Sequence, residues 1–336
     1  MLRIYFVAVA LMAAALSSAQ ETAVDSSRTV EPPVSGSINY QTNYGRHYDA
    51  ENDPTLWDFP HVVIDVAASL GRGWHAVGEF EYERFRQEGA WQNYFRDNYT
   101  TNLLYLDKQW SQAAGMKVGI LNIPVGILNN YGPALTIYDP NSEVEVMPAT
   151  WHDFGVSFYG TSGKIDYQAS TYFYSEFTAH STRFLGGLLR ADYRPVEGLR
   201  IGTSGYYGTS DWGMVQKTTP IELPHKKSFF GSVDGDYQSD VWTVSGSFIY
   251  SNADARSVGL EAGYDVAAAL GAKSLRVVPF ARYDNWRVAG TTTQDYILGI
   301  HIVPLKNLEL IGQFGRNFAA RATNFFDLSF NYTWEF

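Results

Sequence analysis

Apolar residues recur at every second position along most of this chain, in segments of about ten residues separated by turn-forming residues. A period of two is typical of β-strands that have one apolar and one polar face. The C-terminal segment shows the pattern most clearly, because six apolar side chains alternate there with polar ones: Phe326, Leu328, Phe330, Tyr332, Trp334 and Phe336. Such a strand has a continuous apolar face and a continuous polar face.

The alternation predicts sixteen strands, which begin near residues 35, 58, 73, 99, 114, 151, 164, 183, 198, 226, 240, 255, 272, 293, 307 and 324. An even number allows a closed antiparallel barrel with both ends of the chain on one side. The fifth strand, Met116 to Ile123, alternates poorly, so counts of 14 and 18 stay open.

The connections between these strands alternate in length. The even-numbered ones are short (71–73, 111–113, 161–163, 195–198, 238–239 and 304–307), and several odd-numbered ones are longer (47–57, 87–98, 124–150 and 210–225). Outer-membrane barrels have short periplasmic turns and longer extracellular loops, whereas a soluble β-sandwich gives no reason for this asymmetry. We therefore predict an all-β fold, a transmembrane antiparallel up-and-down β-barrel over residues 35–336.

The N-terminus has the pattern of a secretory signal peptide. Arg3 precedes an apolar run from Ile4 to Leu16, and small residues then allow cleavage after Ala19. The alternative is a membrane anchor, but this run of 13 residues is shorter than the roughly 20 that a spanning helix needs. Residues 1–19 are predicted to be removed, and residues 20–34 to form a flexible lead-in.

Composition narrows the functional classes further. The chain has no cysteine, which excludes disulfides, thiolate metal sites and a cysteine nucleophile. Its net charge is −10, and it becomes −11 when the segment with Arg3 is removed. Nucleic-acid binding depends on Lys and Arg at phosphates, so no nucleic-acid partner is expected. No cofactor is expected either.

The stretch from Trp110 to Gly160 resembles the porin O/P family, the phosphate-selective-porin-like outer-membrane proteins. The resemblance lies in Gly115-Met116-Lys117-Val118-Gly119, Asn122-Ile123-Pro124-Val125-Gly126, Met147-Pro148-Ala149-Thr150-Trp151 and Asp153-Phe154-Gly155-Val156-Ser157-Phe158-Tyr159-Gly160. Glu79-Phe80-Glu81-Tyr82-Glu83 and Tyr105-Leu106-Asp107 are similar to the family's third and fourth strands. The match is sharpest over about 50 residues and diffuse elsewhere.

This resemblance implies a 16-stranded, trimeric diffusion channel in which the third extracellular loop folds into the lumen. That loop would be Pro124 to Thr150. It has no Lys or Arg and carries the acids Asp139, Glu143 and Glu145. Because phosphate-selective members line their channels with Lys and Arg, phosphate selectivity is not expected here.

Charged residues on the polar faces of the strands are candidates for lining the pore. They are Glu79, Glu81, Glu83, Asp107, Lys117, Asp153, Asp166, Arg276, Arg282 and Asp284. Acids are in excess on these faces, so a modest preference for cations is expected. Alternatively, these charges pair with one another and only solvate the inner wall. The group of Arg276, Arg282 and Asp284 could also face the third-loop acids across the constriction.

The aromatic C-terminal strand, with Phe330, Tyr332, Trp334 and Phe336, is interpreted as the segment used in barrel assembly. The expected partners are outer-membrane lipid, the barrel-assembly machinery, periplasmic chaperones, small ions and hydrophilic solutes, and two further copies of the chain in a homotrimer.

Other functions receive less support from the sequence. Asp139, Asn141 and Glu143 have the one-three-five spacing that begins a calcium loop, but the Gly and Glu that complete it are missing, so a solvated acidic loop is favoured. The histidines lack metalloprotease spacing, and no Gly-x-Ser-x-Gly elbow occurs. Hence no enzyme is predicted. A substrate-specific uptake channel, a barrel enzyme and a closed structural barrel stay open as alternatives.

Overall fold

The computed structural model describes residues 33–48, 55–87, 90–91, 99–138, 140–148, 151–173, 185–209, 214–215, 220–221, 228–319 and 322–336. The predicted signal peptide and nearly all of the predicted lead-in lie outside these residues. None of the helices among the described residues is long and apolar enough to cross a membrane.

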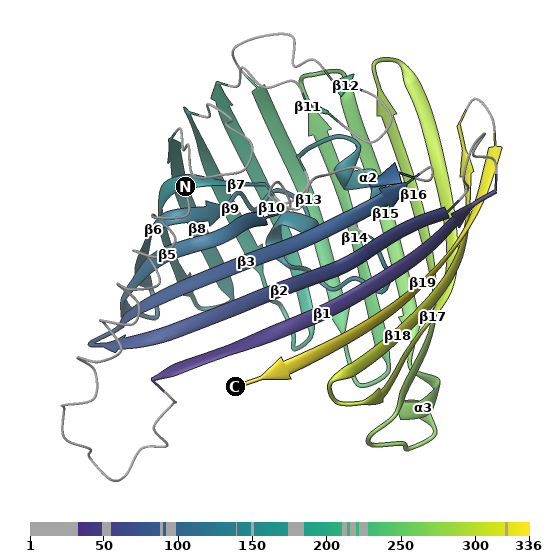
Figure 1. The fold of residues 1–336 in the computed structure, drawn as a ribbon. Helices are drawn as coiled ribbons and strands as arrows, with labels where there is room; N and C mark the ends of the chain where they lie inside the picture. Colours follow the sequence, from purple (N-terminus) through teal and green to yellow (C-terminus); the bar gives the residue numbers. More distant parts are fainter. Residues whose placement is uncertain are drawn as a thin grey trace.

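Sixteen antiparallel strands form a closed barrel (Figure 1). They are β1 (Val34–His47), β2 (Thr55–Gly71), β3 (Trp74–Gln87), β5 (Tyr99–Ser111), β6 (Ala114–Asn122), β7 (His152–Ser162), β8 (Ile165–Phe173), β9 (Leu185–Tyr193), β10 (Leu199–Thr209), β13 (Ser228–Gln238), β14 (Trp242–Ser251), β15 (Ala255–Tyr264), β16 (Arg276–Val288), β17 (Thr291–Leu305), β18 (Leu308–Phe318) and β19 (Ala322–Glu335). Each strand pairs with the next along the chain, and β1 pairs with β19 to close the ring.

The remaining elements are short and belong to connections. They are β4 (Ala90–Trp91), the β11 (Met214–Val215) and β12 (Pro220–Ile221) pair, the 3-10 helix η3 (Leu128–Asn130), and the helices α2 (Asn141–Val144) and α3 (Val266–Ala269). The all-β barrel that the alternation predicts is thus confirmed, and each of the sixteen predicted starts lies within four residues of the start of a barrel strand.

One strand boundary differs from the expected pattern. The alternation continues through Val266, but the strand ends at Tyr264 and α3 follows. The Asp265 carboxylate caps this helix because it accepts hydrogen bonds from the backbone N–H groups of Ala267 and Ala268. An aspartate at this position satisfies donors that a helix start leaves unpaired, and this favours a helical turn over two further strand residues.

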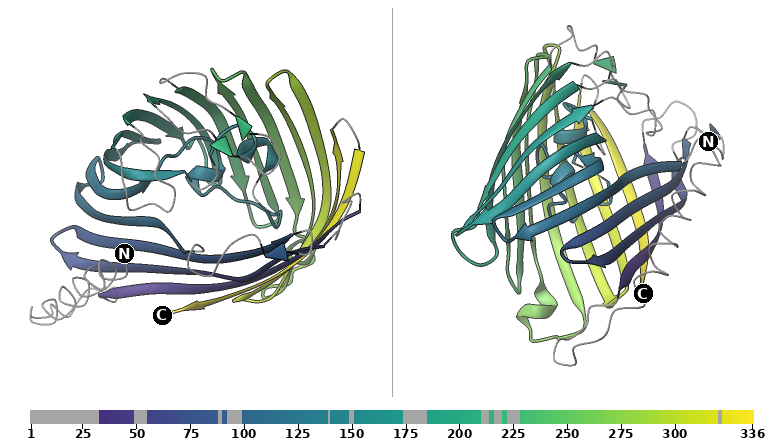
Figure 2. Two further views of the ribbon diagram at one scale, coloured as in Figure 1. Left: turned by 45° about the horizontal axis from the view of Figure 1, so that its top comes forward. Right: turned by 90° about the vertical axis from the view of Figure 1, so that its left-hand side faces the viewer.

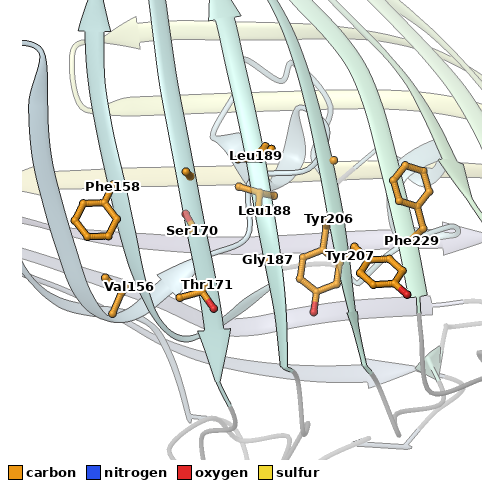
Figure 3. A pocket seen from close by; sticks show the side chains of 12 residues that line it. Val156, Phe158, Ser170, Thr171, Gly187, Leu188, Leu189, Tyr206, Tyr207 and Phe229 are labelled. Atoms are coloured by element: carbon orange, nitrogen blue, oxygen red, sulfur yellow. The ribbon is translucent and has the colours of Figure 1, made fainter.

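The outer face of the wall is apolar and exposed. On β19 the side chains of Leu328, Phe330, Tyr332 and Trp334 are exposed on this face, as is Phe336 directly after the strand, whereas Asp327 and Ser329 on the other face are buried. Where outward residues are small, between β7 and β13, the face has a shallow apolar depression, lined among others by Phe158, Gly187, Leu189, Gly205 and Tyr207 (Figure 3).

The connection between β6 and β7 lies inside the barrel. Figure 2 shows this segment within the ring of strands when the barrel is viewed obliquely from one end. It includes η3 and α2. Its contacts explain why the strand at Met116–Ile123 alternates poorly. Leu121 and Ile123 contact the loop's own apolar residues Val125, Met147 and Trp151 on the inside of the wall, so both faces of this strand are apolar near its end.

Candidate functional site: the charged interior of the barrel

We call residues 123–151 the inserted loop. Its backbone is tied to side chains on strands that are far apart around the ring. The N–H of Gly126 donates to Ser232 Oγ on β13 at 3.1 Å, and that of Leu135 donates to Glu261 Oε1 on β15 at 2.7 Å. The N–H of Ile137 donates to Gln313 Oε1 on β18 at 3.1 Å. The loop therefore crosses the interior and contacts the wall opposite its own strands.

An apolar cluster fixes the start and end of the inserted loop. Trp151 packs between Tyr206 on β10 and Phe230 on β13, with ring centroids 4.7 and 5.0 Å away. Tyr172, Leu188 and Ile249 extend the same cluster along the inner wall. These inward aromatic and aliphatic residues would be unfavourable in a water-filled lumen, and the loop removes them from water.

Glu143 organises the loop itself. Its carboxylate accepts hydrogen bonds from the backbone N–H groups of Ile127, at 3.0 Å, and Leu128, at 2.8 Å. The side chain is fully buried, and this burial raises its pKa above the usual value. Glu145 is also buried, and Asp139 lies outside the described residues. Of the predicted constriction acids, Glu143 thus holds the loop together and has no surface open to the channel.

Two arginines form a charged ladder under the beginning of the loop. Arg190 on β9 contacts Asp192 and Asp234 at 2.7 Å each, and Arg200 on β10 contacts the same two carboxylates and Asp236. Arg190 also donates to the carbonyl oxygen of Pro124 at 3.2 Å. Buried charges persist only when they are paired and hydrogen-bonded, and here they hold the loop against the wall.

The predicted group of Arg276, Arg282 and Asp284 is divided in the structure. Arg282 pairs with Asp284 at 2.6 Å and with Glu261 at 3.3 Å. All three are buried, and Arg282 lines a small cavity together with Glu143 of the loop. Arg276 instead pairs with Asp265 beside α3. This burial does not fit a water-facing role for Arg282 and Asp284.

The predicted acids of β3 lie on a different wall. Asn102 on β5 donates from Nδ2 to Glu79 Oε1 at 3.0 Å and to Glu81 Oε2 at 2.7 Å. His61 on β2 contacts Glu81 at 2.9 Å and Glu83 at 3.5 Å. The side chains of Glu81 and Glu83 are partly exposed, at 16% and 28%. Glu79 and Glu81 thus share the amide of Asn102, and Glu81 also contacts an imidazole, whereas arginines pair with the carboxylates of the opposite wall.

The other predicted residues are dispersed. Asp107 accepts a hydrogen bond from the Tyr159 hydroxyl at 2.7 Å, and Lys117 lies over the rings of Tyr105 and Tyr159. Asp153 is buried and accepts the N–H of the next residue. Asp166 pairs with Arg194 at the end of the barrel with short turns. The structure therefore brings Glu79, Glu81 and Glu83 together on one wall. Arg282 stays with Asp284, and Lys117 lies directly opposite Asp107 on the paired strand.

Sequence reasoning missed Asp58 and His61 as functional candidates. They are three residues apart on one strand, so regular alternation places them on opposite faces. Both face the same three-residue cluster with Glu83. The signal that could have found them is Pro60 between them, because a proline inside a strand marks an edge or a bulge.

No protein-family model matches this chain. A segment of 133 residues is 30% identical to an uncharacterized protein of Aquifex aeolicus (strain VF5); it covers 38% of this chain and 30% of that protein. The chain thus matches about a third of the length of this curated relative, so the comparison leaves the predicted membership of the porin O/P family as a prediction.

Solved outer-membrane proteins share the architecture. OmpT of Vibrio cholerae, expressed in the outer membrane, superposes with a TM-score of 0.62 at 11% identity, over 91% of this chain and 99% of that one. Pseudomonas putida OprB at high pH gives 0.65 at 9%, over 90% and 94%. The anion-selective porin from Comamonas acidovorans gives 0.56 at 11%, over 90% and 99%. At this identity the likeness concerns the fold alone: the chain has the barrel fold of porin-type outer-membrane proteins.

Proposed function

We propose that this chain is an outer-membrane porin through which ions and small hydrophilic solutes diffuse passively, with a modest preference for cations. The observation that carries the cation preference is the contrast between the two inner walls. The wall under the inserted loop pairs its carboxylates with Arg190, Arg200 and Arg282. The wall of β2, β3 and β5 holds Glu79, Glu81 and Glu83 with Asn102 and His61.

The electrostatic reason is that a low-dielectric wall focuses the field of the charges on its surface. Clefts lined by one sign of charge raise the local concentration of counter-ions, and rings of Asp or Glu are used in cation channels for this purpose. A carboxylate that is held by a neutral amide keeps its charge, whereas one that is paired with arginine contributes little net field. The β3 acids therefore dominate the potential felt by a passing ion.

The test is the zero-current potential of the reconstituted protein in planar bilayers with unequal KCl on the two sides. We expect the sign of a cation-preferring channel. Replacing Glu79, Glu81 and Glu83 together by Gln should move the potential toward zero. A matched control removes three exposed acids outside this wall (Glu197→Gln, Asp240→Asn and Glu335→Gln) and should leave the potential unchanged. Anion preference of the native channel would overturn the charge assignment.

We also propose that the chain is exported with cleavage after Ala19, is inserted by the barrel-assembly machinery with the help of periplasmic chaperones, and forms trimers as a member of the porin O/P family. The position of the inserted loop between the third pair of strands supports the family, and a V. cholerae OmpT structure of this fold is described as a trimer form. N-terminal sequencing of the mature protein should begin at Gln20, and cross-linking in outer membranes should give a three-chain product. Another N-terminus or a monomer only would contradict these two proposals.

A further inference from the structure

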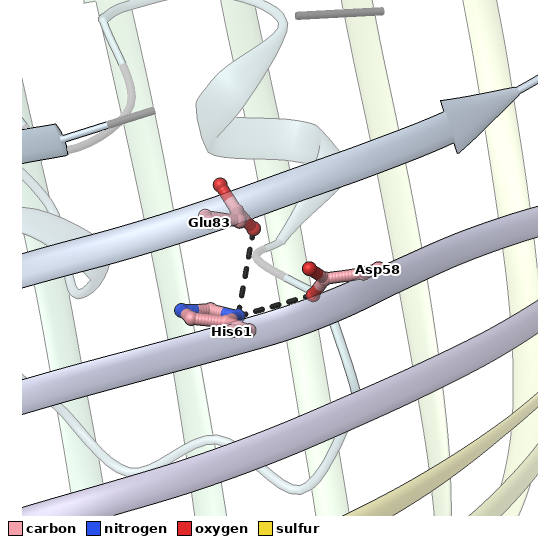
Figure 4. A group of neighbouring side chains, drawn as sticks. All are labelled: Asp58, His61 and Glu83. Atoms are coloured by element: carbon pink, nitrogen blue, oxygen red, sulfur yellow. Dashed lines mark hydrogen bonds and ion pairs between the residues drawn. The ribbon is translucent and has the colours of Figure 1, made fainter. Parts of the chain in front are cut away.

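A β-bulge in β2 brings Asp58 and His61 to the same face of the strand. Without the bulge, two residues three positions apart would point to opposite faces. Asp58 is opposite Phe85 of β3, and His61 is opposite Glu83. Three steps along β2 therefore correspond to two steps along β3, and one extra residue is accommodated. Such a bulge redirects side chains, and here it places Asp58 and His61 on the same face as Glu83, where Figure 4 shows the three side chains converging.

The spacing of the three groups is that of metal ligands. Nδ1 of His61 lies 3.0 Å from Asp58 Oδ2 and 3.5 Å from Glu83 Oε1. One nitrogen and two oxygen atoms of the three residues all lie within 4.8 Å of one another. Zinc binds imidazole nitrogen and carboxylate oxygen at roughly 2.0–2.2 Å in tetrahedral geometry, which puts ligand atoms about 3.3–3.5 Å apart. Only small side-chain movements would close these distances around one ion.

The surrounding contacts orient the imidazole as a ligand. Nε2 of His61 lies 2.9 Å from Glu81 Oε1. A histidine that ligates a metal commonly donates its second ring N–H to a carboxylate, which fixes the tautomer and leaves the other nitrogen free to ligate. Asn43 donates from Nδ2 to Asp58 Oδ2 at 2.8 Å and so fixes the aspartate as well.

Asp58 supplies an independent indication of a ligand. Its side chain is 1% exposed, and among the described residues its Oδ1 atom has no hydrogen-bond partner. A buried carboxylate oxygen without a partner is costly. A proton on Nδ1 of His61 serves the carboxylates of Asp58 and Glu83 incompletely, whereas a divalent cation between them can bind both.

We propose that Asp58, His61 and Glu83 bind one divalent first-row transition-metal ion, with Glu81 as the positioning residue of the imidazole. One imidazole and two carboxylates suit zinc and its neighbours in the series. With three protein ligands, a fourth position stays available for water. Metal binding at this site does not require that the barrel conducts ions.

Zinc alone is the probe. Isothermal titration of the full mature protein in detergent, stripped with a chelator, should give one zinc site per chain. His61→Gln should abolish this site, and Glu81→Gln should weaken it about 10–100-fold, as losses around a ligating histidine usually do. X-ray absorption of the zinc-loaded protein should report one nitrogen and two carboxylate oxygen ligands from the protein.

His301→Gln is the matched control, because His301 is also a buried wall histidine with a carboxylate neighbour, Glu309 at 3.5 Å. It should bind zinc like the native chain. Folding of each variant is checked by heat-modifiable migration on gels; should His61→Gln fail to fold, Glu83→Gln replaces it, since Glu83 is the most exposed ligand. No zinc binding by the native protein, equal binding by the His61 or Glu83 variant, or a shell of oxygen ligands only would overturn the proposal.

Discussion

Replacing Trp151 by Ala tests what holds the inserted loop inside the barrel. The indole is buried and contacts Tyr206 and Phe230 across the interior. Removing a buried tryptophan costs about 3–5 kcal/mol. The backbone hydrogen bond that joins the two ends of the loop, from the Ile123 N–H to the Trp151 carbonyl oxygen at 2.7 Å, does not involve the indole. The free energy lost is therefore that of docking the loop against the wall.

Because about 1.4 kcal/mol is a tenfold change in an equilibrium constant, this loss should raise the population of the undocked loop at least about a hundredfold. Single-channel recordings should then show more frequent current fluctuations than the native channel. Trp110→Ala is the control, because Trp110 is 57% exposed near the end of β5 and, among the described residues, does not belong to the apolar cluster that holds the loop. Equal current noise in the Trp151 variant and the native channel would refute the role of the apolar cluster.

Three further changes test other parts of the account. Arg190→Met leaves the buried Asp192 and Asp234 with one partner fewer and should lower the free energy of unfolding in urea by about 3–5 kcal/mol. Loss of the exposed Arg194 pair should cost less than about 1 kcal/mol, and equal losses would contradict the structural role of the buried arginines. Gly126→Ala should speed chymotrypsin cleavage in the loop, since Gly126 has φ +75° and a Cβ would lie 2.6 Å from the Glu143 carboxylate; unchanged cleavage would argue against that packing. Phe336→Ala should slow insertion into vesicles that contain the assembly machinery, measured by heat-modifiable migration, and an unchanged rate would argue against the assembly role of the last strand.

Much of the barrel could be predicted because the residues of each strand carry the pattern that identifies it, without reference to distant segments. Lipid-compatible and polar side chains alternate within each strand, and all sixteen starts follow from this pattern. The failures come from contacts between distant segments. The inner residues Tyr172, Tyr206 and Phe230 are apolar because the loop covers them, and nothing in their own strands indicates that cover.

The candidate site was less predictable for the same reason. Glu143 is an acidic loop residue in sequence, yet the backbone N–H groups of Ile127 and Leu128 make it a buried organising group. Arg282 belongs to the polar face as expected, but its pairing with Glu261 depends on the register between β15 and β16, which places the two residues directly opposite each other and which alternation alone does not specify. The bulge at Asp58 and His61 interrupts the strict alternation of inward and outward residues, and the prediction of which residues face inward depends on that alternation.

Both the fold and the proposed function require a barrel with an apolar outer face and a water-filled, charged interior. Because the chain has no native cysteine, single cysteines can test this directly. Leu106 and Asp107 are neighbours in the middle of β5, with Leu106 on the exposed apolar face and Asp107 on the opposite one. Single-cysteine variants of the protein in lipid vesicles are treated with a charged, membrane-impermeant thiol reagent. We expect rapid modification of Asp107→Cys and protection of Leu106→Cys. Modification of the Leu106 variant with protection of the Asp107 variant would contradict this arrangement of the two faces.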